Sequence, residues 1–174
     1  MDIQTIPKVK LIIGIIYSKS SNINTCLSHL EKVFGPIDQR SIEFNFDMTD
    51  YYEQEMGKEL LRMFVSFQNL IEAQQIAEIK RLSNIIELNY YLKDGRSINL
   101  DPGYLDMDKF VLVSAKYGRQ KIYLSKGIYA DATLYFYKKE FHAYPWSFPD
   151  FSSGSYDDYF IEVRTKYKSQ IKNL

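Results

Sequence analysis

The sequence lacks most of the residues and motifs from which common active sites are built. Its only cysteine, Cys26, has no partner for a disulfide within the chain, which favours a reducing compartment. With only His29 and His142, a histidine-rich zinc site is excluded. The chain has no G-x-x-x-x-G-K-[ST] phosphate loop, no G-x-G-x-x-G turn, no H-E-x-x-H and no G-x-S-x-G. These absences remove the commonest nucleotide-binding, metalloprotease and serine-hydrolase chemistries.

An excess of either charge and a long apolar run are also missing. Basic and acidic residues both number 22, so the net charge is zero, and we do not expect nucleic-acid binding. The apolar segment 9–16 is too short to cross a bilayer and has no cleavage site after it. It predicts a first buried strand, in a cytoplasmic protein with no membrane partner.

Aromatic residues, by contrast, are abundant. Of the 174 residues, 16% are aromatic, with 15 Tyr and 11 Phe. Tyrosine combines an apolar ring with a polar tip, and this suits both pocket walls and interfaces. A well-packed sheet protein would explain the same composition. The length predicts a single domain over residues 1–174.

Hydrophobic periodicity predicts an α+β fold. Residues 8–17, 41–47 and 61–67 read as strands, and residues 23–34 and 73–91 as helices. Five further strand patterns follow between residues 96 and 144, and a helical pattern ends the chain. We expect a twisted, largely antiparallel sheet with helices mainly on one face. It should have a ferredoxin-like βαββα start, a β-meander and a C-terminal helix.

The segment 46–56 is both acidic and aromatic, a combination expected where a sheet edge opens into a polar pocket. Asp47, Asp50 and Glu53 could converge there, with Tyr51 as a wall. Clustered carboxylates bind hard cations such as Mg²⁺ or Mn²⁺, or act as acid and base. Alternatively, Asp50 only caps a short helix and Glu53 favours its N-terminus.

A second candidate is the string Asp101-Pro102-Gly103-Tyr104. Pro-Gly is the central pair of a type II turn, so Asp101 is predicted to end a strand at the rim of the sheet. Either Asp101 is an ordinary turn former or it joins the acidic site, with Tyr104 as a wall. Asp101→Asn would be silent in the first case and would relieve like-charge repulsion in the second.

Two further groups complete the candidates. Two-residue spacing puts Tyr129 and Asp131 on one strand face, which is either exposed or a pocket floor. His142 lies in a short strand before Trp146, the only tryptophan, which stands in a proline-flanked loop. Such a loop covers a site or simply buries its tryptophan.

Two functions remain open. The first is a small-molecule-binding protein or enzyme with an acidic, tyrosine-lined pocket, which functions with or without a divalent metal. Its catalytic candidates are Asp47, Asp50, Asp101 and His142, and its binding candidates are Tyr51, Glu53, Tyr104, Tyr129, Asp131 and Trp146. The second is a protein-interaction module or homodimer without chemistry.

Several strings resemble the blocks of domain-of-unknown-function family 4416, a family of uncharacterised prokaryotic proteins. They are VKLIIG (9–14), FGPID (34–38), FDMTDYYEQEMG (46–57), DPGYL (101–105), KIYL (121–124), GIYA (127–130), PW (145–146) and PD (149–150). The block 47–57 is the most specific part, although Met48 stands where a phenylalanine is expected. The resemblance supports a single domain and implies no mechanism. Some members are labelled GTP-binding, which no motif in this chain supports.

Overall fold

The computed structural model describes residues 2, 6–48, 52–92 and 95–172. Its main sheet contains nine strands, and seven of them follow the order β11-β10-β8-β7-β1-β4-β2. The seven are β11 (Glu140–Ala143), β10 (Ile128–Tyr137), β8 (Lys109–Ser114), β7 (Ile98–Leu105), β1 (Val9–Ser18), β4 (Leu60–Ile71) and β2 (Ile37–Arg40). Two short strands lie off this path: β3 (Phe44–Asn45) pairs with β4, and β9 (Ile122–Ser125) pairs with β10. Every pairing in the sheet is antiparallel.

The first half of the chain has the ferredoxin-like arrangement that the sequence predicts. Strand β1, helix α1 (Ile23–Phe34), strands β2 and β4, helix α3 (Ile76–Glu87) and strand β7 follow one another, and the four strands lie in the order β7-β1-β4-β2. Strands β8, β10 and β11 then extend the sheet beyond β7 as the predicted meander. The α+β class is therefore confirmed.

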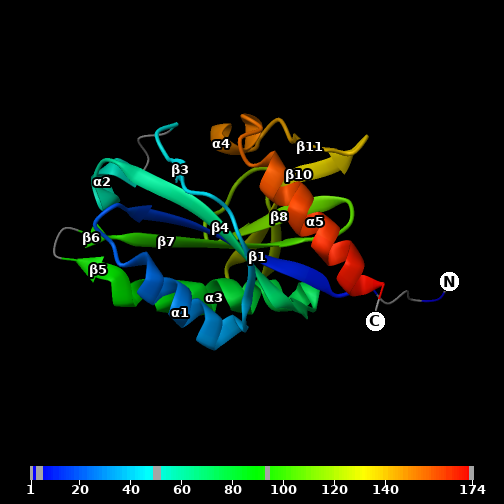
Figure 1. Ribbon diagram of the computed structural model, residues 1–174, viewed down its shortest axis with the longest axis horizontal. Coiled ribbons are helices and arrows are strands. Elements are labelled where there is room, and N and C mark those ends of the chain that lie inside the picture. The colour runs from blue at the N-terminus through cyan, green and yellow to red at the C-terminus, as the bar shows by residue number, and fades with distance from the viewer. Residues whose placement is uncertain (1, 3–5, 49–51, 93–94, 173–174) are drawn as a thin grey trace.

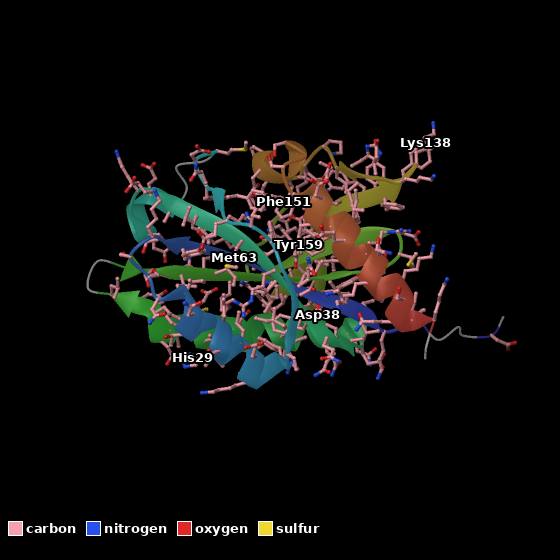
Figure 2. The ribbon with its side chains drawn as sticks, viewed as in Figure 1. His29, Asp38, Met63, Lys138, Phe151 and Tyr159 are labelled. Carbon is pink, nitrogen blue, oxygen red and sulfur yellow. The ribbon has the colours of Figure 1, made fainter. Side chains whose placement is uncertain are left out.

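Helices cover both faces of the sheet (Figure 1). Alternate residues of β1 point to opposite faces, so Leu11, Ile13 and Ile15 pack with α1 and α3 while Ile12 packs with the C-terminal helix α5 (Asp157–Ile171). Cys26 is fully buried in the first layer. The second layer is the more aromatic, and it includes Phe151 of the short helix α4 (Pro149–Ser152) and Tyr159 of α5, which Figure 2 labels.

One predicted strand is wrong. In place of a strand over 41–47, the structure has β2 at Ile37–Arg40 and the two-residue β3. The pattern placed Ile42, Phe44 and Phe46 on one buried face, but Ile42 is 73% exposed while Phe46 is 7% exposed. The aromatic side chains are buried by α2 (Glu53–Met56) and α5 instead of by a continuous strand, because Phe46 packs with Met56 and Phe44 with Tyr156.

The remaining elements are short. Two 3₁₀ turns, η2 (Ala73–Gln75) and η3 (Leu88–Tyr90), flank α3, and β5 (Tyr91–Leu92) pairs with β6 (Gly95–Arg96) in a small separate hairpin. The two 3₁₀ turns and α3 together cover residues 73–90 of the helix predicted over 73–91. Among the described residues, no helix combines the length and apolar composition that a bilayer crossing requires.

Candidate functional site

Asp101 lies inside a strand, so the predicted turn is wrong. It pairs with Gly14 of β1, and the next residues continue along β1 without interruption. The ladder between β7 and β8 begins only at Gly103, so Pro102, which has no N–H group, lies beyond the end of that ladder. Gly103 is needed for packing, since a Cβ there would lie 2.5 Å from the carbonyl oxygen of Val111. The Pro-Gly pair thus marks the point where the pairing between β7 and β8 ends. Asp101 lies in the part of β7 that does not pair with β8.

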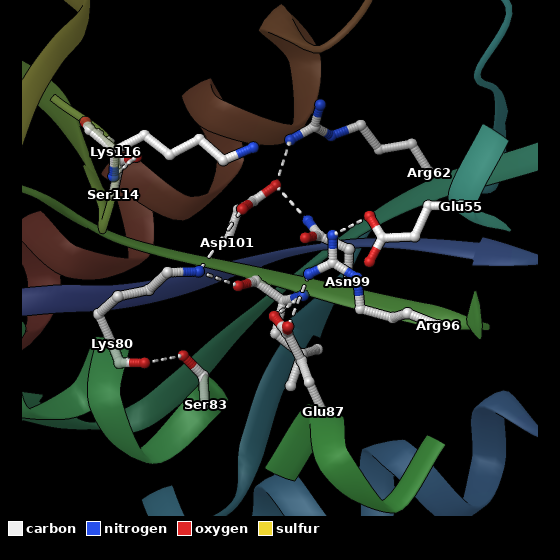
Figure 3. A network of polar contacts seen from close by, with 11 residues as sticks. Glu55, Arg62, Lys80, Ser83, Glu87, Arg96, Asn99, Asp101, Ser114 and Lys116 are labelled. Atoms are coloured by element: carbon white, nitrogen blue, oxygen red, sulfur yellow. Dashed lines mark hydrogen bonds and ion pairs between the residues drawn. The ribbon is translucent and has the colours of Figure 1, made fainter. Parts of the chain in front are cut away.

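The surroundings of Asp101 are mainly cationic (Figure 3). The guanidinium NH2 of Arg62 and the ammonium of Lys80 each lie 3.7 Å from its carboxylate. Asn99 donates a hydrogen bond to Oδ2 at 2.7 Å. The side chain of Lys116, which follows β8, extends toward the same carboxylate. The side chain of Asp101 is 23% exposed, whereas those of Arg62 and Lys80 are buried.

Arg62 links Asp101 to a second, fully buried carboxylate. Its NH1 group donates to Asp150 Oδ2 at 2.5 Å, and Tyr156 donates to the same oxygen at 3.1 Å. Burial alone would lower the pKa of Arg62, but the charges of Asp150 and Asp101 outweigh it and raise the pKa. The guanidinium therefore stays charged inside the protein.

Aromatic rings surround the Arg62 guanidinium. Its Cζ atom lies 5.0 Å from the ring centroids of Phe64 and Phe151 and 5.4 Å from that of Phe46. Gly14 leaves the space that this side chain needs, because a Cβ there would lie 3.1 Å from Arg62 NH2.

Lys80 and Glu87 of α3 form hydrogen bonds with the peptide groups of Leu100 from the other face of the sheet. Lys80 Nζ donates to the Leu100 carbonyl at 2.7 Å, and Glu87 Oε1 accepts from the Leu100 N–H at 2.7 Å. Arg96 bridges Glu87 at 2.8 Å and Glu55 of α2 at 2.9 Å. Burial raises the pKa of Glu87, although Lys80 and these hydrogen bonds oppose that shift. A line of alternating charges therefore connects α2, α3, β7, β4 and α4.

Phe46, Tyr52 and Glu55 of the acidic, aromatic segment lie beside this network. Burial raises the pKa of Tyr52, and the Asp101 carboxylate adds to that shift. The Tyr52 ring also packs on Phe46 at 5.8 Å. Within the same segment Asp47 and Glu53 are exposed, and the predicted residues Asp50 and Tyr51 lie outside the described residues.

Asp131 and Tyr129 lie on β10 and have other partners. Asp131 is 3.8 Å from Lys121 and 3.3 Å from the amide of Gln120, and its Oδ1 has no hydrogen-bond partner among the described residues. Burial raises the pKa of Asp131. The Tyr129 ring packs on Tyr123 at 5.4 Å.

Tyr104, His142 and Trp146 are also separate from the Asp101 network. Tyr104 packs against the core on the α1 and α3 face, and burial raises its pKa. His142 on β11 stacks on Tyr135 at 5.3 Å. Trp146 is 45% exposed and donates from Nε1 to the Ala132 carbonyl at 2.8 Å, so its loop does not bury it.

Two expectations, a metal-binding group and a pocket lined by the predicted site residues, find no support in the described part of the chain. No three His, Cys, Asp or Glu side chains there form a group that could hold a metal ion. A cavity of about 320 Å³ lies between β3 and α4 and has Glu43, Asp150, Phe46 and Tyr156 in its wall. None of the predicted site residues that the structure describes lines this cavity.

Sequence reasoning missed Arg62, Lys80, Glu87 and Arg96, because charged residues were read as solvated. One signal was available on α3. Lys80, Ser83 and Glu87 fall at helical spacing alongside the apolar stripe of Ile76 and Ile79, and all are buried. A charge within an apolar stripe indicates a buried ion pair.

The fold and the network define an α+β protein with a ferredoxin-like start and a network of buried, oppositely charged side chains beside its central strands. The chain belongs to the family described as domain of unknown function (DUF4416), whose family model matches residues 7–167. Neither the curated proteins nor the solved structures contain a match to the chain.

Proposed function

We propose that this protein binds a small polar molecule at Asp101, as a binding protein or an enzyme. Lys80, Arg62 and Lys116 surround the acceptor oxygens of a carboxylate, phosphate or carbonyl group of that molecule, and Asp101 accepts one of its protons or hydrogen bonds. The earlier expectation of an acidic pocket is thereby replaced by a site of mixed charge.

The observation that carries the proposal is the 3.7 Å spacing of two buried cations around one carboxylate. That distance is longer than a hydrogen bond, so the N–H groups of Lys80 and Arg62 keep donor capacity toward a further acceptor. Among the described residues, the three donors of the Lys80 ammonium have one hydrogen bond, to Leu100.

The arrangement is held in place before any ligand arrives. The Leu100 peptide fixes Lys80, and Asp150 fixes Arg62 from the opposite side. In a partly buried site such donors act more strongly on a ligand charge than they would in water. Asp101, as the most exposed charge of the three, faces the approach and is the candidate proton acceptor in an enzyme.

Thermal unfolding with added ligands tests the proposal. Orthophosphate, pyrophosphate and succinate serve as anionic probes, and at least one should raise the unfolding midpoint, since ligands that bind the folded state stabilise it. Lys80→Met should abolish the shift. Lys126→Met is the matched control because Lys126 is exposed and pairs only with Glu78 among the described residues.

Two results would overturn it. One is equal ligand response in the Lys80 and Lys126 variants. The other is a midpoint shift with Mg²⁺ or Mn²⁺ but with none of the anions, which would favour the metal-binding version of the original expectation.

A second candidate function is self-association through α3. Ile85, Leu88 and Leu92 are 56%, 65% and 64% exposed and follow one another along the end of this helix and β5. An apolar row of this kind suits a protein interface. Sedimentation of the wild type and of Ile85→Glu/Leu88→Glu tests it, and a monomeric wild type would remove this candidate.

A further inference from the structure

A row of aromatic rings crosses the surface of β10, β11 and the loop that follows. Trp146 stacks on Tyr144 at 5.0 Å with an interplanar angle of 10°, and Tyr144 packs on Tyr135 at 5.0 Å. Tyr135 in turn stacks on His142. Tyr135 and Trp146 are 37% and 45% exposed, so the rings reach solvent instead of the core.

A cavity of about 490 Å³ opens beside this row, between β11 and the turn from α4 to α5. Tyr135, His142 and Tyr144 line one side, and Asp157, at the start of α5, lines the other. Hydrogen bonds from Trp146 Nε1 to Ala132 and from Ser147 Oγ to Thr133 hold the loop against β10. The groove is therefore bounded by fixed elements and combines ring faces with a carboxylate.

We propose that this groove binds an organic cation, such as a quaternary ammonium group, between the faces of Tyr135 and Tyr144 and the carboxylate of Asp157. The residues that would hold the cation, Tyr135, Tyr144 and Asp157, are distinct from the charged network around Asp101, so the proposal stands independently of the proposed function.

The charges around the groove determine which ligand charge the groove favours. Asp158 and Glu140 are near enough to Asp157 to raise its pKa, after the larger effect of burial, while His142 opposes the shift. Three carboxylates and one histidine disfavour a phosphate or carboxylate ligand and favour a cation. Ring faces attract cations for the same electrostatic reason. At the end of the same row, the Lys138 ammonium lies 5.3 Å from the Tyr137 ring centroid, a cation–π contact already present in the fold.

Choline and 3,3-dimethyl-1-butanol provide a direct test, because they share a shape and differ in charge. Binding is followed by calorimetry and by the emission of Trp146, the only tryptophan in the chain, which stacks on a ring of the groove. Choline should bind saturably and the neutral alcohol at least about tenfold more weakly, the size of a desolvated cation–π contact.

Variants locate the binding. Tyr144→Leu and Asp157→Asn should each weaken choline binding by about tenfold. Tyr123→Leu and Glu162→Gln are the matched controls, since they remove an exposed tyrosine on β9 and a carboxylate from the same helix α5, and they should leave binding unchanged. Four results would each overturn the proposal. Two concern choline and the alcohol: no saturable binding of choline, or equal binding of the alcohol. The other two are binding of cellobiose but not of choline, and an equal loss of binding in the control variants.

Discussion

The effect of Asp101→Asn on the free energy of unfolding distinguishes three possible roles of Asp101, because each role predicts a different sign. A turn former would tolerate the change without loss, and a member of an acidic cluster would become more stable. In the structure the carboxylate lies between two buried cations, so removing its charge should destabilise the protein. Asparagine keeps the shape and the hydrogen-bonding role toward Asn99 but no longer balances the Lys80 charge.

The expected loss follows from burial and distance. Removing one partner of a fully buried ion pair costs about 3–5 kcal/mol. Asp101 is 23% exposed and its cations lie at 3.7 Å, so solvent screens part of the interaction, and Arg62 keeps Asp150 as a partner. We therefore expect a loss of about 1–3 kcal/mol. For a chain of this length that lowers the unfolding midpoint by about 2–4 °C per kcal/mol.

Urea unfolding of the wild type and of Asp101→Asn at pH 7 measures this loss. Asp47→Asn is the matched control, because Asp47 is exposed in the loop after β3 and its variant should stay within about 0.5 kcal/mol of the wild type. An Asp101→Asn protein as stable as the wild type, or more stable, would refute the cationic environment inferred for this carboxylate.

Three further predictions concern residues near Asp101 and are tested by urea unfolding. Arg62→Met should cost about 3–5 kcal/mol because it leaves Asp150 buried and unpaired, and Arg62→Met/Asp150→Leu should recover most of that loss. A double variant as unstable as the sum of the single ones would contradict this. Gly103→Ala should cost about 1–3 kcal/mol, since its Cβ would lie 2.5 Å from a backbone oxygen of β8, and an unchanged midpoint would disprove the close approach. Burial raises the pKa of Glu87, so the folded state keeps its proton to higher pH than the unfolded chain. The stability of the wild type relative to Glu87→Gln should therefore fall as the pH rises from about 4 to 7; a difference that is constant or rises would count against it.

Sequence patterns predicted the fold well because most of its elements are set by local periodicity. Every residue of β1 except Ser18 is buried, which confirms the buried strand that the apolar segment 9–16 predicted. The same method failed at residues 41–47, where alternation suggested a strand. There the aromatic residues are buried by contacts with α2 and α5, and such distant partners leave no local pattern.

The candidate site was less predictable, since its chemistry comes from pairings between distant residues. The sequence names Asp101 as a candidate, but the partners of its carboxylate, Arg62 and Lys80, come from another strand and from a helix. The Pro-Gly string had two meanings, a turn or the end of a strand pairing, and only the position of β8 decides between them. Asp131 and His142 were named as candidates, and their partners lie on β10, β11 and the loops around them.

The buried charges themselves argue for a function at Asp101. A buried ion pair often stabilises a protein no more than apolar side chains of the same volume would, because the loss of hydration offsets the attraction. Arg62, Lys80, Glu87 and Asp150 are all buried, so this chain places four ionisable groups where packing alone favours apolar ones. Lys80 and Arg62 meet the partly exposed carboxylate of Asp101, while Glu87 binds the neighbouring Leu100 peptide and Asp150 binds Arg62. Such an arrangement is expected where charged groups must be presented to a bound molecule in a fixed geometry. A ligand at Asp101 would then use charges that the fold has already desolvated and oriented.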